Sequence, residues 1–367
     1  MKYLFILGRN IELSIEEIKS FFRRNNFQLG EIKLINNGLL VETNSEIKDS
    51  IIESLGGTIS IGEVLIEGNG KKMLEELDKK NLYNTTGNKL NYIIHNFDGN
   101  IDEISSYLKK RFKNDELKAT EKKPTGNIKL QSGEIIKKTN SKLIDEEYFI
   151  FGNNFGRIIE SSNYEKIEER DMEKPVRRNE LSISPRLAKI LINLSEVREG
   201  ETLLDPFCGI GTILQEALLQ DIRVIGIDRD RDAVNNARKN MQWFGFDASN
   251  YQLMNEDSSM IKTKRVQAIA TEPELGELQR GVPSEEKAKE ILRSFEELMA
   301  RVLRNLKDNV KGRIVFTAPL ILTGRKRPAC NFESISSRTG LKIVKGFPIS
   351  EFRDNSIVGR SIVVMEK

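Results

Sequence analysis

Histidine and cysteine are scarce in this sequence, which contains one histidine, His95, and two cysteines, Cys208 and Cys330. Zinc centres, Ser-His-Asp triads and Cys-His pairs depend on these residue types. Each would have to be built around His95, which follows the apolar residues 92–94 and which we interpret as structural. Two cysteines are too few for a disulfide framework. We therefore predict no metal site and a reducing compartment, the cytoplasm.

Long apolar runs and a strong charge of one sign are lacking too. No stretch approaches the roughly 18–20 apolar residues that span a membrane, and residues 3–7 are too short before Arg9 for the core of a signal peptide. With 58 basic and 55 acidic residues, any affinity for nucleic acid has to come from local patches. We predict no membrane partner, and 367 residues are enough for two or three domains.

An apolar segment runs into a glycine-containing turn at residues 203–212, Leu-Leu-Asp-Pro-Phe-Cys-Gly-Ile-Gly-Thr. Glycines let a backbone approach a nucleotide-like ligand closely. A second apolar segment, 224–227, then ends at Asp228, at the spacing expected for an acid that binds a ribose. Apolar residues follow Gly211 where a dinucleotide fingerprint needs a third glycine. The pattern predicts a nucleoside-binding half of a doubly wound α/β sheet.

The string Asp205-Pro206-Phe207-Cys208-Gly209-x-Gly211-Thr212 resembles motif I of the S-adenosylmethionine-dependent methyltransferases that methylate exocyclic amines of bases. The resemblance implies S-adenosylmethionine as cofactor, with the amides of two glycines beside its methionine part and one carboxylate accepting from its ammonium group. A second carboxylate would accept from both ribose hydroxyls, and a third from the adenine amine. The implied cofactor-binding residues are Asp205, Phe207, Gly209, Gly211, Thr212, Asp228 and Asp257.

The first 67 residues have their own pattern. It predicts, in order, a strand at 3–7, a helix at 14–24 with a capping box of Ser14 and Glu17, two strands around Asn36-Asn37-Gly38, a helix at 45–55 and a strand at 59–66. This βαββαβ order is ferredoxin-like. A helix from residue 72, a strand at 90–97, a helix at 104–112 and strands near 132–138, 147–151 and 157–160 are expected to follow.

Basic residues gather upstream of the glycine turn. Residues 101–142 contain Lys109, Lys110, Arg111, Lys113, Lys118, Lys122, Lys123, Lys129, Lys137, Lys138 and Lys142 against six acids. Several of them end the expected helix at 104–112, and glycine or proline turns follow, which favours phosphate binding over a merely solvated face. Arg325, Lys326 and Arg327 follow a strand that we expect to end near Pro319, on the edge where a substrate enters an α/β sheet. A solvated loop is the alternative there.

The order of these features resembles the THUMP-containing RNA methyltransferases that modify the N2 amine of guanosine in tRNA, of the archaeal and eukaryotic guanosine-10 type. A THUMP-like segment ends in Phe155-Gly156-Arg157, a linker carries Arg170-Asp171-x-x-Lys174-Pro175-x-Arg177-Arg178, and the helix Ser184-Pro185-Arg186-Leu187-Ala188 precedes motif I. The resemblance implies a ferredoxin-like domain at 1–67, a THUMP-like RNA-binding domain at 68–162, a linker at 163–180 and a methyltransferase domain at 181–367. That last domain would have a Rossmann-like, mostly parallel seven-stranded sheet.

The same resemblance implies tRNA as partner and a set of RNA-binding residues: Lys109, Lys110, Lys113, Lys122, Lys123, Arg177, Arg178, Arg325, Lys326 and Arg327. Some relatives depend on a small zinc-binding activator protein, which makes such a protein a candidate partner here.

The catalytic motif departs from that family. Its members carry Asp or Asn, two prolines and an aromatic residue, whereas this chain has Thr271-Glu272-Pro273-Glu274-Leu275-Gly276. The lone pair of an exocyclic amine is delocalised into the ring, so the enzyme has to accept hydrogen bonds from the NH2 group. Glu272 can accept and Pro273 can stiffen the turn, but Glu274 replaces the second proline and Leu275 cannot stack on a base. We predict Glu272, Pro273 and Glu274 as catalytic residues.

Three interpretations of the altered motif stay open. The target amine sits farther out, or the substrate has changed and both glutamates face it, or the protein is a degenerate binder of cofactor and RNA. The function predicted from the sequence is S-adenosylmethionine-dependent methylation of the N2 amine of a guanosine in tRNA. Methylation of DNA, or of another base amine, is the alternative.

Overall fold

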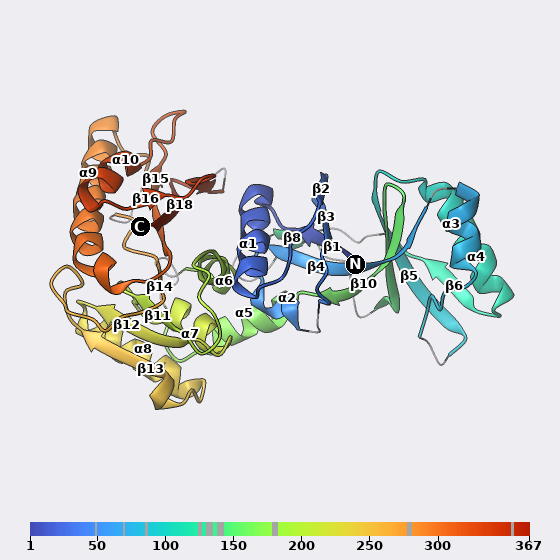
Figure 1. Ribbon diagram of the computed structural model, residues 1–367, viewed down its shortest axis with the longest axis horizontal. Helices are drawn as coiled ribbons and strands as arrows, with labels where there is room; N and C mark the ends of the chain where they lie inside the picture. The colour runs from blue at the N-terminus through green and yellow to red at the C-terminus, as the bar shows by residue number, and fades with distance from the viewer. Residues whose placement is uncertain are drawn as a thin grey trace. The chain divides into compact units, whose positions relative to one another are not determined.

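The computed structural model describes residues 1–47, 50–68, 70–84, 87–123, 127–129, 135–137, 143–177, 183–276, 281–353 and 356–367. They form two compact units (Figure 1). The first comprises Met1–Ile15, Phe27–Glu53 and Gly57–Glu169, and the second comprises Glu16–Asn26, Ser54–Gly56 and Arg170–Lys367. Among the described residues, no helix combines the length and the apolar character needed to cross a membrane.

One eight-stranded sheet runs through the first unit, in the order β2-β3-β1-β4-β10-β9-β5-β6. Neighbours from β2 to β9 are antiparallel, whereas β5 runs parallel to β9 and to β6. The strands are β1 (Lys2–Leu7), β2 (Ile32–Ile35), β3 (Gly38–Glu42), β4 (Thr58–Glu67), β5 (Lys89–Phe97), β6 (Lys118–Glu121), β9 (Glu146–Phe151) and β10 (Asn154–Ser161). The strands β7 (Asn127–Lys129) and β8 (Ile135–Lys137) form a separate hairpin.

Residues 1–173 contain the helices α1 (Ile11–Arg24), α2 (Ile51–Ser54), α3 (Gly70–Leu77), α4 (Ile101–Asn114) and α5 (Tyr164–Glu173), which occupies part of the predicted linker. α1 from Glu16 onward and α5 from Arg170 onward belong to the second unit. The predicted βαββαβ order of residues 1–67 is confirmed. Strands on both sides of the boundary predicted at residue 67 share the eight-stranded sheet, because β4 pairs with β10. The core includes stacked aromatic rings, with those of Tyr148 and Phe155 5.5 Å apart, and His95 lies 2.9 Å from Glu147 on the neighbouring strand.

Three local predictions in the first unit were wrong. Ser14 lies inside α1 rather than capping it, because the amide of Leu13 donates to Asn10 Oδ1 at 3.1 Å and the helix begins earlier. The helix predicted at 45–55 shrinks to α2, because Ser50 has a left-handed φ of 76° and the amide of Ile52 donates to the carboxylate of Glu160. The strand β6 was missed, since its sequence Lys-Ala-Thr-Glu carries no apolar alternation.

The sheet of the second unit has the order β13-β12-β11-β14-β15-β18-β16, and β17 also pairs with β18. From β13 to β15 all neighbours are parallel, and β18 is antiparallel to β15. The strands are β11 (Thr202–Asp205), β12 (Arg223–Asp228), β13 (Tyr251–Asn255), β14 (Ala268–Thr271), β15 (Ile314–Ile321), β16 (Lys342–Ile343), β17 (Ile349–Glu351) and β18 (Val358–Glu366). The predicted doubly wound α/β fold is confirmed for this part.

The helices of the second unit connect these strands: α6 (Pro185–Leu194), α7 (Thr212–Leu218), α8 (Arg231–Trp243), α9 (Glu285–Leu306) and α10 (Phe332–Thr339). The strand β15 was predicted to end near Pro319 and ends two residues later, at Ile321, where β18 pairs with it through Val358. The carboxyl ends of parallel strands meet at one edge of a sheet, and ligands of such sheets bind outside that edge. Asp205 ends β11, Asp228 ends β12, and Glu272 follows the last residue of β14.

Candidate functional site at the carboxyl edge of the second sheet

The turn after β11 depends on two glycines in the left-handed region. Gly209 has a φ of 52° and Gly211 has a φ of 87°, conformations that side chains disfavour. A β-carbon at Gly211 would also lie 2.7 Å from Cε of Met241 on α8. The helix α7 starts directly after Gly211. The pattern Gly-x-Gly therefore has a geometric reason, because this tight turn brings Gly211, at the start of α7, close to side chains of α8.

Asp228 ties this turn to the next strand. Its Oδ2 accepts from the amide of Gly209 at 2.9 Å, and its Oδ1 accepts from the amide of Asp230 at 2.9 Å. The amide of Cys208 also donates to the carbonyl of Ile227 at 2.9 Å. A carboxylate oxygen can accept more than one hydrogen bond. Asp228 therefore holds the glycine turn in place and keeps acceptor capacity at the edge of the sheet.

Asp205 is a buried carboxylate, 1% exposed, beside the same turn. Its Oδ1 accepts from the hydroxyl of Thr271 at 2.5 Å and from the amide of Phe207 at 3.1 Å. Burial raises the pKa of Asp205 to about 7, and the nearby charges of Asp228 and Glu272 add to the rise against those two hydrogen bonds. Within the described residues, Asp205 has no ion-pair partner. Such a site favours a cation, because a buried charge needs an opposite charge.

Asp257 lies two residues beyond β13. Its Oδ1 accepts from the amide and the hydroxyl of Ser259 at 2.8 and 2.7 Å, and these bonds lower the pKa of this exposed carboxyl group. The next residue, Ser258, donates to the carbonyl of Pro206 at 2.6 Å. The structure therefore brings the Asp257 turn against the start of the turn that carries Gly209.

Two residues that the sequence analysis did not assign to the site fasten the segment before α6 to the glycine turn. Asn240 of α8 donates to the carbonyls of Val176 and Ile210 at 3.1 Å and accepts from the amide of Val176 at 3.1 Å. Lys174 is buried and donates to Asp171 at 2.5 Å and to Thr212 Oγ1 at 3.4 Å. An asparagine inside an amphipathic helix gives no sequence signal for such a role.

Glu272 turns inward, into an ion pair. Its side chain is 8% exposed, and its Oε1 accepts from Nε of Arg360 at 2.5 Å and from the hydroxyl of Thr317 at 3.2 Å. Among the described residues, Oε2 accepts one hydrogen bond, a long one of 3.4 Å from Nη2 of Arg360. Against the cost of burial, Glu272 raises the pKa of the Arg360 guanidinium. Oε2 is therefore the oxygen with free acceptor capacity.

The rest of the altered motif divides between core and solvent. Pro273 is buried, and Leu275 packs against the apolar core of the sheet. The side chain of Glu274 is 64% exposed and lies 4.0 Å from a guanidinium nitrogen of Arg229. Glu272 and Glu274 thus lie in different surroundings, one within a hydrogen-bond network and the other in solvent.

The basic residues predicted for RNA binding are spread over both units. Lys110, Lys113, Lys122 and Lys123 are exposed, and Lys109 pairs with Glu121 at 3.1 Å. Arg325 and Lys326 are exposed, whereas Arg327 lies over the ring of Phe352 at 4.5 Å and donates to the carbonyl of Ser356 at 2.6 Å. Arg177 follows Val176, and Arg178 lies outside the described residues, as do the side chains of Lys129, Lys137, Lys138 and Lys142. Because Arg327 contacts the ring of Phe352 and the carbonyl of Ser356, it has a structural role.

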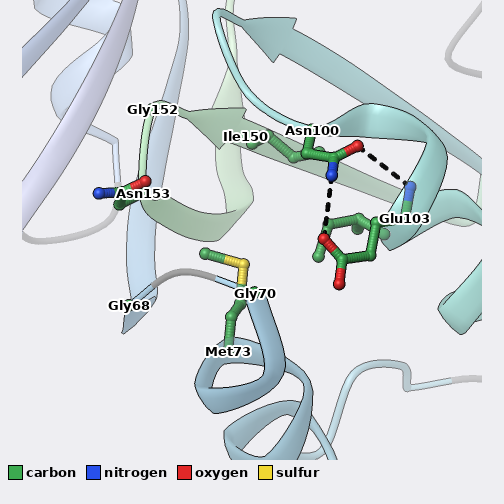
Figure 2. A pocket seen from close by; sticks show the side chains of 9 residues that line it. Gly68, Gly70, Met73, Asn100, Glu103, Ile150, Gly152 and Asn153 are labelled. Atoms are coloured by element: carbon green, nitrogen blue, oxygen red, sulfur yellow. Dashed lines mark hydrogen bonds between the residues drawn. The ribbon is translucent and has the colours of Figure 1, made fainter.

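A cavity of about 370 Å³ lies within the first unit, between the starts of α3 and α4 (Figure 2). Its walls include Met73, Ile104 and Ile150. The side chain of Asn100 donates to Glu103 Oε2 at 3.0 Å and accepts from the amide of Glu103 at 3.4 Å, so these two residues cap α4 (Figure 2). None of the predicted site residues lines this cavity. In the described part of the chain, no cluster of His, Cys, Asp and Glu is arranged to hold a metal ion.

Two family models match this chain. UPF0020, described as an RMKL-like methyltransferase domain, matches residues 175–319 and so covers the glycine turn and the Glu272 motif. N6_N4_Mtase, described as DNA methylase, matches residues 37–239 and ends within α8. The second sheet is therefore that of a methyltransferase domain.

Archaeal proteins named tRNA (guanine(10)-N2)-dimethyltransferase are similar to parts of the chain. That of Methanothermobacter thermautotrophicus is 41% identical over 96 residues, 26% of this chain, and the chain spans only 28% of that protein's length. That of Methanocaldococcus jannaschii is 26% identical over 288 residues, 73% of this chain and 80% of that protein. The crystal structure of TrmN from Thermus thermophilus aligns over the full length of both chains with a TM-score of 0.50 and 13% identity, a likeness of fold.

Proposed function

We propose, from the premise that the chain belongs to the methylase family whose model covers residues 37–239, that it transfers a methyl group from S-adenosylmethionine to the N2 amine of a guanosine in tRNA. The observation that carries the proposal is the meeting of Asp205, Asp228 and Glu272 at the carboxyl edge of one methyltransferase sheet. Two of these carboxylates suit the cofactor, and the third suits an amine. The names of the archaeal relatives supply the nucleoside and the position, guanosine 10 of tRNA.

The site fits S-adenosylmethionine on its own geometry. Asp205 offers a buried carboxylate without a cationic partner in the described residues, which suits the ammonium group of the methionine part. Apart from the chain neighbours of Gly209, no atom of the described residues lies within 4 Å of where a β-carbon on Gly209 would stand, so this side of the turn is open to a ligand. Asp228 would accept from the ribose hydroxyls, and Asp257 would accept from the adenine amine. Phe207 packs beside the turn.

The cofactor, when bound, supplies a methyl group on a sulfonium centre, and the residues around it orient the acceptor. Glu272 accepts a hydrogen bond from the target amine and so holds the nitrogen lone pair toward the methyl group. Pro273 stiffens the turn that carries this carboxylate. Glu274 is exposed beside Arg229 and follows Glu272 by two residues, and it would contact the rim of the base. The transfer would form an N–C bond to the amine as the sulfonium S–C bond breaks, and the proton that the methylated nitrogen then loses would pass to the carboxylate of Glu272. It needs orientation and electrostatics, with no covalent bond to the enzyme.

The remaining parts of the chain suit a tRNA substrate. In residues 1–67 the sheet order β2-β3-β1-β4 with antiparallel neighbours supports a ferredoxin-like domain, and 68–162 is the proposed THUMP-like domain. The exposed Lys110, Lys113, Lys122 and Lys123 would contact phosphates. Residues 163–180 would connect these domains to the methyltransferase domain at 181–367. We propose that the protein acts on tRNA in the cytoplasm, and a small zinc-binding activator protein stays a proposed partner.

Label transfer tests the proposal directly. The full chain is incubated with S-adenosylmethionine tritiated on the methyl group and unmethylated tRNA, and the RNA is then digested to nucleosides. We expect label in N2-methylguanosine or N2,N2-dimethylguanosine. Label in another nucleoside would contradict the assigned target, and cofactor binding without label in any nucleic acid would contradict the proposed activity. A tRNA with adenosine in place of guanosine 10 is the matched control, and it should stay unlabelled.

Methylation of DNA is the second candidate, because the family model that covers residues 37–239 is described as DNA methylase. The amine chemistry at Glu272 would be the same for a base in either polymer. Duplex DNA and tRNA offered in one reaction with the same cofactor separate the two. Label that appears only in DNA would replace the tRNA proposal by this one.

A further inference from the structure

Arg360 holds the carboxylate that we propose to be catalytic. It lies on β18, antiparallel to β15, and is paired with Pro319 in the strand register. Thr317 of β15 sits two residues away on the same face of the strand, since side chains alternate between faces. Both residues donate to Oε1 of Glu272, and the Arg360 bond is 2.5 Å long. Two strands outside the catalytic turn thus fix one oxygen of its carboxylate.

We propose that Arg360 is a positioning residue for methyl transfer: by fixing Oε1 of Glu272 it aims Oε2 at the target amine. The proposal rests on the proposed function of Glu272. A charge-assisted bond from a guanidinium is strong and directional. With Oε1 fixed by two donors, the carboxylate cannot rotate freely, and Oε2, with one long contact of 3.4 Å, keeps a vacant acceptor direction.

The extra methylene of glutamate has a use in this arrangement. An aspartate at residue 272 would be shorter by one methylene, so its carboxylate could not reach Arg360 and keep the same backbone position. The chain therefore carries a longer acid together with an arginine on β18. This pair compensates for the missing second proline and aromatic residue at Glu274 and Leu275, because orientation comes from an ion pair rather than from a rigid turn.

Arg313 provides a matched control at the opposite end of the same two strands. It precedes Ile314, which pairs with Met365 near the end of β18. Its side chain is 15% exposed, and it forms ion pairs with Glu196 at 2.7 Å and with Glu366 at 3.7 Å. Arg313 and Arg360 are thus both partly buried, paired arginines that join β15 and β18 to acids. Only Arg360 reaches the carboxyl edge where the reaction would occur.

The test is a double-mutant cycle on the full chain, with Glu272→Gln, Arg360→Met and the two combined, beside Arg360→Lys and Arg313→Met. For each protein, kcat and KM for unmethylated tRNA and the Kd for S-adenosylhomocysteine are measured. Arg360→Met should lower kcat by about 10- to 100-fold and leave the Kd within about twofold. The combined variant should be no slower than Glu272→Gln alone, because the two residues act as a unit.

Two controls keep the result specific. Arg360→Lys should recover part of kcat, since lysine keeps one charged donor without the guanidinium fork. Arg313→Met should lower the melting temperature at least as much as Arg360→Met does but keep kcat within about twofold. A multiplicative loss in the combined variant, or an equal loss of kcat in Arg313→Met, would overturn the positioning role. Full activity of Glu272→Gln would instead overturn the proposed function, and with it the premise of this inference.

Discussion

Two acidic side chains lie at the ends of neighbouring parallel strands. They differ in whether a cationic side chain of the protein forms an ion pair with them. Asp205 at the end of β11 has hydrogen bonds but, among the described residues, no ion pair, and its pKa is raised to about 7 mainly by burial. Glu272 after β14 has its own arginine at 2.5 Å. Thr271, the residue before Glu272, donates to Asp205.

The difference assigns separate tasks to the two acids. A buried carboxylate without a partner is unstable as an ion until a cation arrives, so Asp205 is suited to bind the charged part of a cofactor. A carboxylate that already has an arginine gains little from another cation, and it is suited to orient a neutral group such as an amine. We therefore expect cofactor affinity to depend on Asp205 and turnover on Glu272.

The largest effect is expected when Glu272 is shortened. Glu272→Asp keeps the charge but removes the reach to Arg360, so kcat for tRNA should fall on the order of 100-fold. The Kd for S-adenosylhomocysteine should change less than about twofold, since Asp205 and Asp228 are untouched. Single-turnover methylation and calorimetry on the same preparation measure the two quantities. A kcat close to that of the wild type would show that the ion pair is not needed.

Removing Asp228 should weaken the cofactor. Asp228→Ala loses the ribose acceptor and releases the amide of Gly209, so the Kd for S-adenosylhomocysteine should rise by about 10- to 100-fold. Asp247→Ala is the matched control, because Asp247 also accepts from a backbone amide two residues on, that of Ser249 at 2.8 Å, outside this site. Unchanged affinity in Asp228→Ala, as measured by calorimetry, would refute the ribose assignment.

The affinity for the cofactor should depend on pH through Asp205. Its raised pKa of about 7 means that the free site is partly protonated near neutrality, whereas a bound ammonium group favours the ionised form and lowers that pKa. Affinity for S-adenosylhomocysteine should then be full above about pH 7 and fall by up to about tenfold per pH unit below it. Asp205→Asn should show no such fall over the same range, and a flat profile in the wild type would contradict the assignment.

The smallest effects are expected from the glycines of the cofactor turn, and they act on stability. Gly211→Ala meets both a φ of 87° and Cε of Met241 at 2.7 Å, whereas Gly209→Ala meets a φ of 52° in open space. We expect the free energy of unfolding to fall by about 1–3 kcal/mol at Gly211 and by about 1 kcal/mol at Gly209. Urea unfolding measures both, and the reverse order would show that the contact with Met241 relaxes easily.

The cofactor side of this comparison could be predicted from sequence because its signals are local. A strand, a Gly-x-Gly turn, a helix and a strand ending in an acid lie within 26 residues, from 203 to 228, and fix which groups face the same edge. The predicted glycine turn, the acid at the end of β12 and the parallel order of β11 and β12 were found in the structure. Substrate contacts of these residues stay predictions.

The catalytic side could not be completed from sequence. Arg360 lies 88 residues after Glu272, and no sequence signal distinguishes it from other arginines in strands. Its contact with Glu272 depends on the antiparallel pairing of β18 with β15. The roles of Asn240 and Lys174 follow only from the structure, in which α8 and the segment before α6 contact the glycine turn. Elsewhere, the capping role predicted for Ser14 was wrong because the nearby Asn10 accepts from the backbone amide of Leu13. The helix predicted at 45–55 was too long, and the distant Glu160 accepts from the backbone amide of Ile52.

The most direct test of the two-acid account is one titration of S-adenosylhomocysteine into wild-type protein, Asp205→Asn and Glu272→Gln, with turnover on tRNA measured alongside. We predict that Asp205→Asn loses affinity by about 10- to 100-fold, while Glu272→Gln binds as the wild type does and transfers the methyl group about 100-fold more slowly. Equal loss of affinity in both variants, or full turnover in Glu272→Gln, would contradict it.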